Sequence, residues 1–280
     1  MSGVKVLRNR IKSVKSTQKI TKAMRMVSAA KLHRAKESEG VARFFRDRII
    51  EMLAAAKDSL DQSEISQVNK SILYKDDVCY NSVVIVYSSD RGLCGPFNSM
   101  VYRNLKKDLS EYKNLKIICI GKKIHELLVG KYNVIAYFSG ITNTQKMSSE
   151  INRILIQEVQ DNPHTEVIIY YTKFKNTLIQ IPSKLTLIPV DIENTTQTNN
   201  LEFEGEGLLD KLIELYLEAN IVANFYESKA SEEASRMTAM DNATRNAGEM
   251  IDKLTLKMNR TRQAQITREL IEVISGAEAI

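Results

Sequence analysis

The fold is decided by the C-terminal stretch 208–280, which reads LLDKLIELYLEANIVANFYESKASEEASRMTAMDNATRNAGEMIDKLTLKMNRTRQAQITRELIEVISGAEAI. Alternate steps of four and three residues along it meet apolar or small side chains almost without interruption. These seam positions are Leu212, Tyr216, Ala219, Ala223, Tyr226, Ala230, Glu233, Met237, Met240, Thr244, Ala247, Ile251, Leu254 and Met258. A heptad pattern of this length predicts one long helix packed along another helix, and its alanines allow the two to approach closely.

The heptad register changes after Met258. The old register lands on Thr261, Gln265 and Arg268, while a shifted apolar set runs through Ile266, Leu270, Val273, Ala277 and Ile280. We therefore expect the helix to continue past the end of its partner. A helix over 208–280 would be roughly 110 Å long at about 1.5 Å per residue, longer than a compact domain of this mass requires.

The N-terminal segment supplies a candidate partner. From Val4 to Leu60 it has no proline, and its only interior glycine is Gly40, which favours a helix of about 80 Å. Two groups of apolar residues recur at helical spacing, namely Leu7, Ile11 and Val14, then Val41, Phe45, Ile49, Met52 and Ala56. We predict that the terminal helices pair as an antiparallel coiled coil. An obligate homodimer is the structural alternative.

The middle of the chain has a different composition. All four prolines lie there, at positions 96, 163, 182 and 189, together with seven of the eleven glycines. Short apolar runs alternate with helical patterns near 122–131 and 146–161 and after the loop DRGLCGPFN. The expected strands are 83–88, 117–120, 134–138, 167–171 and 178–190. This alternation predicts βαβ units and a mostly parallel sheet.

The sequence thus predicts an α/β protein in which a coiled coil of both termini accompanies a central Rossmann-like domain. The expected divisions are an N-terminal helix over 1–60, the α/β domain over 61–206 and a C-terminal helix over 207–280. The polar segment DIENTTQTNNLEFEGEG, residues 191–207, is expected to be a loop that leads into the last helix.

Charge is distributed unevenly along the chain. Residues 1–48 carry 14 Lys and Arg but only 3 Asp and Glu, while the net charge of the whole chain is +6. A basic helix indicates an acidic partner, and nucleic acid is one possibility because cationic helices neutralise phosphates. Here the best heptads lie at the opposite terminus and no basic cluster is interleaved with aromatic residues. A nucleic-acid function is therefore the minority interpretation.

One motif invites a nucleotide-binding interpretation. Ser89-Asp90-Arg91-Gly92-Leu93-Cys94-Gly95 follows the first expected strand, where doubly wound folds place a phosphate-binding turn. It matches neither GxGxxG nor GxxxxGK[ST], and no lysine follows at the required spacing. A structural turn is favoured over a nucleotide site.

Residues with metal-binding or catalytic chemistry are scattered. Cys79, Cys94 and Cys119 contain no CxxC pair, and His33, His125 and His164 have no ligand spacing. We predict neither a disulfide nor a metal site, and no cofactor. The doublet Glu232-Glu233 is expected to be solvated helix surface. No nucleophile–base pair can be assembled, so the sequence offers no positive sign of an enzyme.

The sequence also restricts the cellular setting. No stretch approaches the run of about 18 apolar residues that a membrane span needs, and the start MSGVKVLRNRIKSVKS lacks the apolar block of a secretory signal. The first helix begins directly, with no targeting extension, which favours a bacterial protein that stays in the cytosol, although a processed organelle protein would have the same sequence features.

Both ends resemble a known family. The segments NRIKSVKSTQKITKAMRMVSAAKL and EASRMTAMDNATRNAGEMIDKLTLKMNRTRQAQITRELIEVISGAEAI are similar to the two signature helices of the gamma subunits of F-type ATP synthases, and SSDRGLCGPFN resembles that family's central motif. The resemblance covers the whole chain in order. It implies a non-catalytic rotor, the central stalk, present once per complex and peripheral to the bacterial inner membrane.

The resemblance also implies partners and contact residues. The partners would be the alpha and beta subunits, the epsilon subunit and the c-ring, with no insertion into the membrane. Contacts with the beta subunits are implied for Met24, Arg25, Arg236, Arg262 and Gln263, and additional ones for Lys19 and Lys22. An apical bearing is expected at Leu270, Val273, Ile274, Ala277 and Ile280. The inserted redox-cysteine loop of the chloroplast type has no counterpart.

Overall fold

A computed structural model describes residues 3–59, 71–73, 80–190 and 208–278. The main elements follow the order α1 (Gly3–Ser59), β1 (Asn81–Tyr87), α3 (Phe97–Asp108), β2 (Lys116–Ile120), α4 (Lys122–Leu128), β3 (Asn133–Phe138), α5 (Thr144–Asp161), β4 (Thr165–Phe174), β5 (Gln180–Ile188) and α6 (Leu208–Glu278). The predicted domain boundaries at 60/61 and 206/207, and the expected loop 191–207, lie outside the described residues. In its described part the chain has no helix apolar and long enough for a membrane crossing.

The chain forms two compact units. One, the helix-pair unit, comprises Met1–Ser28 and Met237–Ile280, and the other, the sheet unit, comprises Ala29–Arg236. Both terminal helices continue through the boundary, since α1 and α6 are unbroken from end to end in the described residues. Each unit is built from a part of both helices.

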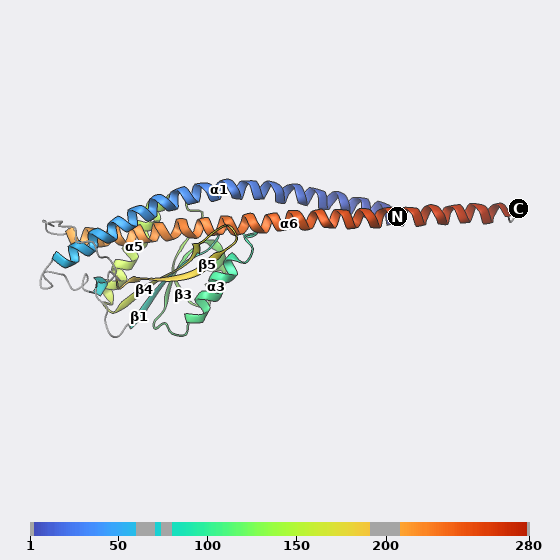
Figure 1. Cartoon of the computed structure of the whole chain (residues 1–280). Coiled ribbons are helices and arrows are strands. Elements are labelled where there is room, and N and C mark those ends of the chain that lie inside the picture. Colours follow the sequence, from blue (N-terminus) through green and yellow to red (C-terminus); the bar gives the residue numbers. More distant parts are fainter. Residues whose placement is uncertain (1–2, 60–70, 74–79, 191–207, 279–280) are drawn as a thin grey trace. The chain divides into compact units, whose positions relative to one another are not determined.

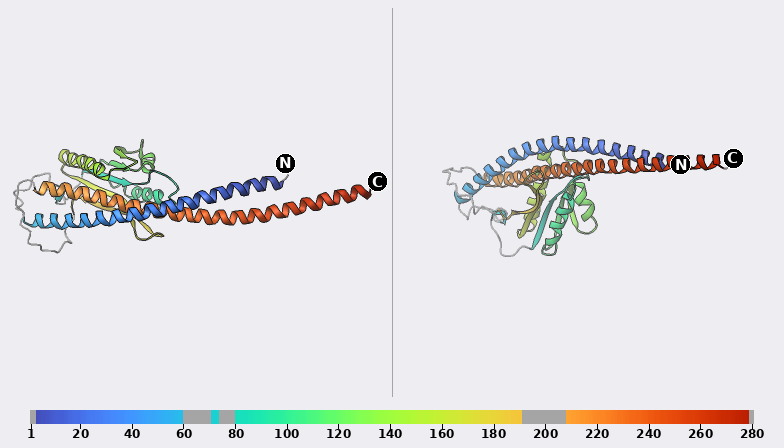
Figure 2. Two further views of the ribbon diagram at one scale, coloured as in Figure 1. Left: turned by 90° about the horizontal axis from the view of Figure 1, so that it is seen from above. Right: turned by 45° about the vertical axis from the view of Figure 1, so that its right-hand side comes forward.

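In the helix-pair unit, α1 and α6 lie side by side and run antiparallel (Figure 1), an arrangement that both views in Figure 2 repeat. Gly3 lies beside Thr261, Gln18 bonds to Thr244, and Arg25 pairs with Asp241, so residue numbers rise on one helix as they fall on the other. The predicted seam of α6 is confirmed, because none of its fourteen positions is exposed. The predicted pairing of the terminal helices is therefore correct.

The apolar positions predicted on α1 are confirmed in part. Ile11, Ile49 and Ala56 are buried and Leu7 and Val14 are half-buried, but Val41, Phe45 and Met52 are exposed. From Ile11 onward, buried and half-buried positions follow alternate steps of three and four through Ile11, Val14, Gln18, Thr21, Arg25, Ser28, Leu32 and Ala35. The middle of this seam is polar: the Thr21 and Thr244 hydroxyls lie 2.8 Å apart, and Gln18 Nε2 donates to the Thr244 carbonyl. A seam of hydrogen-bonding residues has no apolar periodicity, so hydropathy could not locate it.

The sheet unit contains one five-stranded sheet in the order β3-β2-β1-β4-β5. The pairs β3–β2, β2–β1 and β1–β4 are parallel, and β5 joins the edge antiparallel to β4. The order reverses between β1 and β4, which is the topological switch point of a doubly wound sheet. The predicted Rossmann-like domain with a mostly parallel sheet is confirmed.

Helices cover both faces of the sheet. Alternate side chains of each strand point to opposite faces, and β1 has apolar side chains on both of them. On one face, Val83, Ile85 and Tyr87 of β1 pack with α5 and with parts of α1 and α6. On the other face, Val84 and Val86 pack with α3 and α4. Strands buried on both faces read as unbroken apolar runs such as VVIVY, which is why the sequence located them well.

A polar network ties the end of α3 to the last two strands. Asp108 Oδ2 accepts from Tyr170 Oη at 2.6 Å and from Lys184 Nζ at 2.8 Å, and the hydroxyls of Tyr112 and Tyr170 lie 2.5 Å apart. The bonds from Lys184 and Tyr170 hold the pKa of Asp108 below its ordinary value of 3.8. The carboxylate form is therefore the form that the fold favours.

This network predicts an acid-sensitive contribution to stability. Because the folded pKa of Asp108 is depressed, its contribution is complete above pH 3.8 and disappears as pH falls through the folded pKa. We expect Asp108→Asn to lower the melting temperature at pH 7 and to flatten its decline below pH 4. Asp47→Asn, which changes an exposed carboxylate on α1, is the control. If the melting temperatures of the wild type and of Asp108→Asn fell by the same amount as the pH is lowered, this role of Asp108 would be contradicted.

Candidate partner-contact surfaces

The loop 88–98, SSDRGLCGPFN, follows β1 at the carboxyl edge of the sheet, and its polar groups are used within the fold. Asp90 Oδ1 accepts from Lys122 N–H at 3.1 Å, Asp90 Oδ2 accepts from Gly140 N–H at 3.0 Å, and Ser88 Oγ accepts from Ile124 N–H. Gly121 is required here, since its φ is +105° and an added Cβ would lie 2.2 Å from Ser88 O. Asp90 and Ser88 thus join the loop to the start of α4 and to the residues after β3.

The same loop holds α6. Ser235 Oγ donates to the Cys94 carbonyl at 2.7 Å, and Arg236 Nη2 lies 3.3 Å from the Arg91 carbonyl. Inside the loop, Ser89 and Asn98 exchange side-chain hydrogen bonds. The motif is thus a structural turn that docks a helix, as favoured from the sequence.

A buried ionic cluster lies next to this docking point, where the sequence predicted solvated surface. Glu232 and Glu233 are 3% and 2% exposed, so that prediction was wrong. Arg236 Nη2 lies 2.6 Å from Glu232 Oε1, Arg236 Nη1 lies 2.8 Å from Glu233 Oε1, and Lys229 Nζ lies 2.8 Å from Glu232 Oε2. Two cations therefore neutralise two carboxylates, which makes their burial tolerable.

Helix α6 also occupies the switch point of the sheet. The Thr172 N–H donates to Ser228 Oγ at 3.0 Å, and Ser231 Oγ donates to the Thr172 carbonyl at 2.8 Å. A cavity of about 40 Å³ lies there, lined by Ser88, Asp90, Ser228, Lys229 and Glu232 among others. Sites for small molecules measure about 300–1,000 Å³. The cavity is far too small for a nucleotide.

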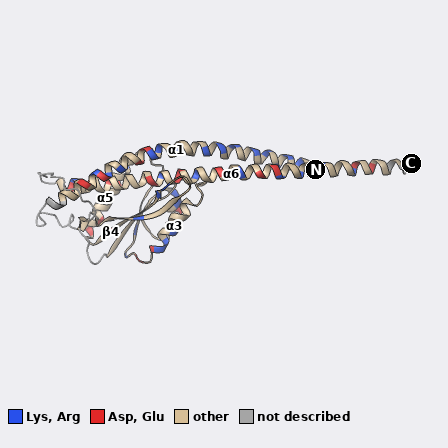
Figure 3. Ribbon diagram, in the orientation of Figure 1, with Lys and Arg blue, Asp and Glu red and all other residues tan. Residues whose placement is uncertain are grey.

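The predicted contact residues of α1 lie on the helix-pair unit. Met24 is half-buried, Lys19 and Lys22 are exposed, and Arg25 is partly exposed, with Nη1 3.0 Å from Asp241 Oδ1. Figure 3 shows how closely Lys and Arg follow one another along the N-terminal half of α1. A partner with acidic groups could approach these cations from solvent.

The predicted contact residues of α6 divide into separate groups. Arg262 and Gln263 are exposed, just past the position where Gly3 marks the start of α1. They lie about 30 Å along α6 from Asp241 at about 1.5 Å per residue, so the structure does not bring them together with Arg25. Arg236 belongs to the sheet unit, where its side chain is 9% exposed and engaged by Glu232 and Glu233.

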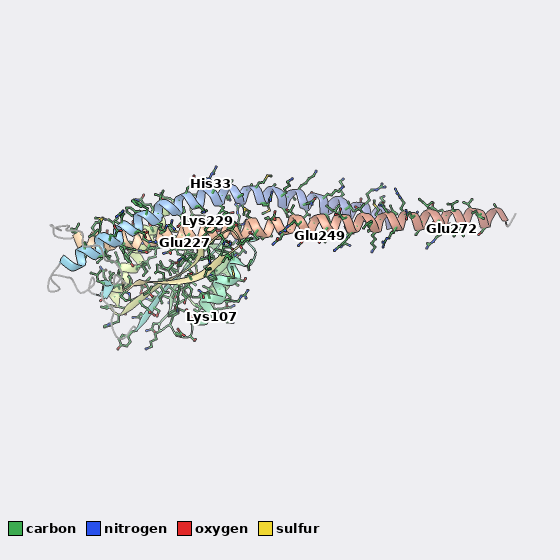
Figure 4. The ribbon with its side chains drawn as sticks, in the orientation of Figure 1. His33, Lys107, Glu227, Lys229, Glu249 and Glu272 are labelled. Carbon is green, nitrogen blue, oxygen red and sulfur yellow. The ribbon has the colours of Figure 1, made fainter. Side chains whose placement is uncertain are left out.

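The end of α6 is apolar and exposed. Leu270, Val273 and Ile274 are 56%, 71% and 54% exposed, and Ala277 is also exposed, while Ile280 lies outside the described residues. Figure 4 labels Glu272 on this same stretch. The predicted bearing residues in the described part of α6 are therefore all open to solvent.

Cysteine and histidine have structural surroundings. Cys94 and Cys119 are buried free thiols, and burial raises the pKa of Cys119 to about 12, while Cys79 lies outside the described residues. His125 stacks on Tyr137, His164 contacts Tyr80 edge-on, and His33 is paired with Glu37. In the described segments, no cluster of three or more His, Cys, Asp or Glu side chains could bind a metal ion.

Sequence reasoning missed the serines of α6. Ser228, Ser231 and Ser235 recur at steps of three and four beside the heptad seam, and each bonds to the sheet or to the loop 88–98. A second periodic stripe of small polar residues on a helix was the signal that could have found them.

Comparison with known proteins covers the full chain. A family model described as ATP synthase matches residues 3–280. The chain is 40% identical over 290 residues to the ATP synthase gamma chain of Rickettsia canadensis, with 100% of both chains covered, and 39% identical over 288 residues to that of Pelagibacter ubique, with 98% of each covered.

Solved structures share the fold. A chain of the Euglena gracilis mitochondrial ATP synthase aligns with a TM-score of 0.65 at 18% identity, covering 99% of this chain and 94% of that one. A chain from the central stalk and c-ring of the Tetrahymena thermophila mitochondrial ATP synthase aligns with a TM-score of 0.59 at 24% identity, covering 80% and 99%. Because the match to the bacterial proteins is full-length and 39–40% identical, the chain belongs to the family of ATP synthase gamma chains.

Proposed function

We propose that the chain is the central rotor shaft of a proton-translocating ATP synthase, which couples turning of the membrane c-ring to conformational changes at the catalytic beta subunits. The full-length similarity to gamma chains carries this proposal. The shaft has no active site of its own. Its partners are the alpha and beta subunits, the epsilon subunit and the c-ring, with one copy per complex. It is held peripherally at the cytoplasmic face of the bacterial plasma membrane through these partners.

The physical basis is differential contact. Three catalytic pairs around an asymmetric shaft meet different faces of it, so one third of a turn exchanges their conformations. Only interactions that differ between states can shift populations. The antiparallel helix pair is asymmetric in this sense, because α1 carries exposed cations and the end of α6 exposes apolar side chains.

The proposed contacts with beta subunits are Met24, Arg25, Arg262 and Gln263, with Lys19 and Lys22 as further cations. Exposed ion pairs contribute about 0.2–1 kcal/mol each, so they can break and reform during rotation. Arg236 stays in the proposed set. Its burial supports an indirect part, in which it holds the loop 88–98 against α6. Leu270, Val273, Ile274, Ala277 and Ile280 form the proposed bearing, which slides without specific bonds.

Assembly tests the proposal directly. A tagged version of the chain, expressed in its own cells, is expected to co-purify with alpha and beta subunits in salt that screens nonspecific contacts. Retention on DNA that salt abolishes, without these subunits, would instead support the nucleic-acid alternative and reject the rotor.

Arg262→Ala is expected to lower the number of protons pumped per ATP hydrolysed by about twofold, because one exposed ionic contact of about 0.2–1 kcal/mol is lost. The ratio is measured in membrane vesicles that contain the variant complex. Arg260→Ala removes an exposed arginine two residues earlier, outside the proposed set, and is the matched control. Equal ratios in the two variants would argue against a contact at Arg262.

A further inference from the structure

We infer that helix α6 is fixed to the sheet unit against twisting by a set of buried hydrogen bonds at the switch point, which we name the crevice joint. It consists of Tyr87, Thr172, Ser228, Ser231, Ser235 and the Cys94 carbonyl. The inference rests on the proposed rotor function, because a joint of this kind matters where torque passes between a domain and a shaft.

Four buried bonds make the joint. Tyr87 Oη donates to the Ile221 carbonyl at 2.7 Å, and Ser235 Oγ donates to the Cys94 carbonyl at 2.7 Å. Between these levels, Ser228 and Ser231 bond to the N–H and the carbonyl of Thr172. The bonds thus attach about four turns of α6 to the end of β1, to β4 and to the loop after β1.

The backbone of β4 explains why the joint lies at this point. Strand pairing between β1 and β4 ends at Tyr170, whereas β4 continues to Phe174. The N–H and carbonyl of a strand residue point to the same side, and both of these groups of Thr172 bond to α6, so neither faces Pro182 on β5. The N–H and carbonyl of Thr172 would be buried without partners if α6 did not supply the serines, and such groups are costly to leave unpaired. The serines of α6 therefore make the hydrogen bonds to Thr172 that a longer β1 would otherwise make.

Hydrogen bonds resist rotation and sliding of a helix on its neighbour, whereas apolar packing mainly resists its separation from that neighbour. Apolar contact is roughly indifferent to direction, so a smooth helix face can turn or slide with little loss. A hydrogen bond weakens steeply when its angle falls toward about 120°. Because the four bonds end on three separate elements, turning α6 about its axis bends all of them together. The joint therefore supplies torsional stiffness beyond what burial gives.

The test measures that stiffness in the assembled complex. The catalytic subunits are immobilised and no ATP is supplied, and a bead is attached through Lys107→Cys on the exposed side of α3, with Cys79→Ser to leave one engineered attachment point (Figure 4). Ser228→Ala with Ser231→Ala removes two of the four bonds. We expect the mean-square angular fluctuation of the bead to rise by up to twofold, because half of the joint's bonds are lost while the apolar packing of α6 remains.

Two controls separate torsional stiffness from general packing. Ile221→Val reduces buried volume at the same interface but keeps every bond, and Ser149→Ala removes an exposed bond from α5 to Glu218 of α6. In both variants the angular fluctuation of the bead is expected to equal that measured with the unaltered chain. A rise in Ile221→Val equal to that of the serine variant would overturn the joint, as would an unchanged fluctuation in the serine variant.

Ser235→Ala provides a milder test if the double variant does not assemble. It removes one bond and is expected to produce a smaller rise in the fluctuation, and no rise would overturn the inference. Failure of the proposed function would look different: a bead on the unaltered chain that did not turn in ATP would reject the rotor, whatever the stiffness of the joint.

Discussion

Arg236→Ala is expected to destabilise the sheet unit by about 3–5 kcal/mol, the usual cost of leaving buried charges without their partner. The guanidinium is the partner of both Glu232 and Glu233, whose side chains are 4% and 3% exposed. After its removal Lys229 can still compensate Glu232, but Glu233 has no cation among its described contacts. One buried carboxylate then must be protonated or must draw water into the fold.

The composition of the chain allows the sheet unit to be followed by itself. There is no tryptophan, and all eleven tyrosines lie between positions 74 and 226. Tyrosine fluorescence in urea therefore reports the sheet unit, whereas circular dichroism reports helices of both units. We expect Arg236→Ala to shift the fluorescence transition to lower urea.

Two further variants test the cause. Arg43→Ala removes an exposed arginine of the sheet unit that pairs with Glu39 at 3.3 Å, and is expected to change stability by less than about 1 kcal/mol. Adding Glu233→Gln to Arg236→Ala should recover part of the loss, because the unpaired charge is then absent. Equal fluorescence midpoints for Arg236→Ala and Arg43→Ala would refute the buried cluster.

The sequence predicted best where burial follows a hydrophobic period. The strands of the sheet, the helix α5 and the seam of α6 from Leu212 to Met258 were located because their buried faces are apolar. Three of the four strand pairs are parallel and only β5 is antiparallel, which agrees with the predicted mostly parallel sheet. The loop 88–98 lacks the glycine spacing of a phosphate-binding turn, and in the structure its Cys94 carbonyl accepts a hydrogen bond from Ser235 of α6.

The sequence predicted worst where polar residues are buried. Glu232 and Glu233 looked solvated because their i,i+3 and i,i+4 spacing to Lys229 and Arg236 predicts ion pairs on a helix but not the burial of those pairs. Thr21, Ser28 and Gln18 were absent from the predicted seam of α1 for the same reason, whereas Val41 and Phe45 were included although they are exposed. A buried polar group is stable only with its partner, and that partner can be more than 200 residues away, as Thr244 is from Thr21.

Ala223→Glu is expected to destabilise the sheet unit by an amount on the order of 3 kcal/mol or more, because it places a carboxyl at a seam position that is 2% exposed. Burial disfavours the charged form, so the pKa of the introduced carboxyl is raised. With a raised folded pKa, the electrostatic part of the loss is largest at neutral pH and shrinks as pH falls toward the unfolded pKa near 4. Ala30→Glu, at an exposed position of α1 in the sheet unit, has the same change in charge without burial. Tyrosine fluorescence in urea at pH 5 and pH 8 measures both variants: the two midpoints of Ala223→Glu should differ more than those of Ala30→Glu. If Ala223→Glu unfolded at the same urea concentration as the wild type at both pH values, residue 223 would not be buried in the seam.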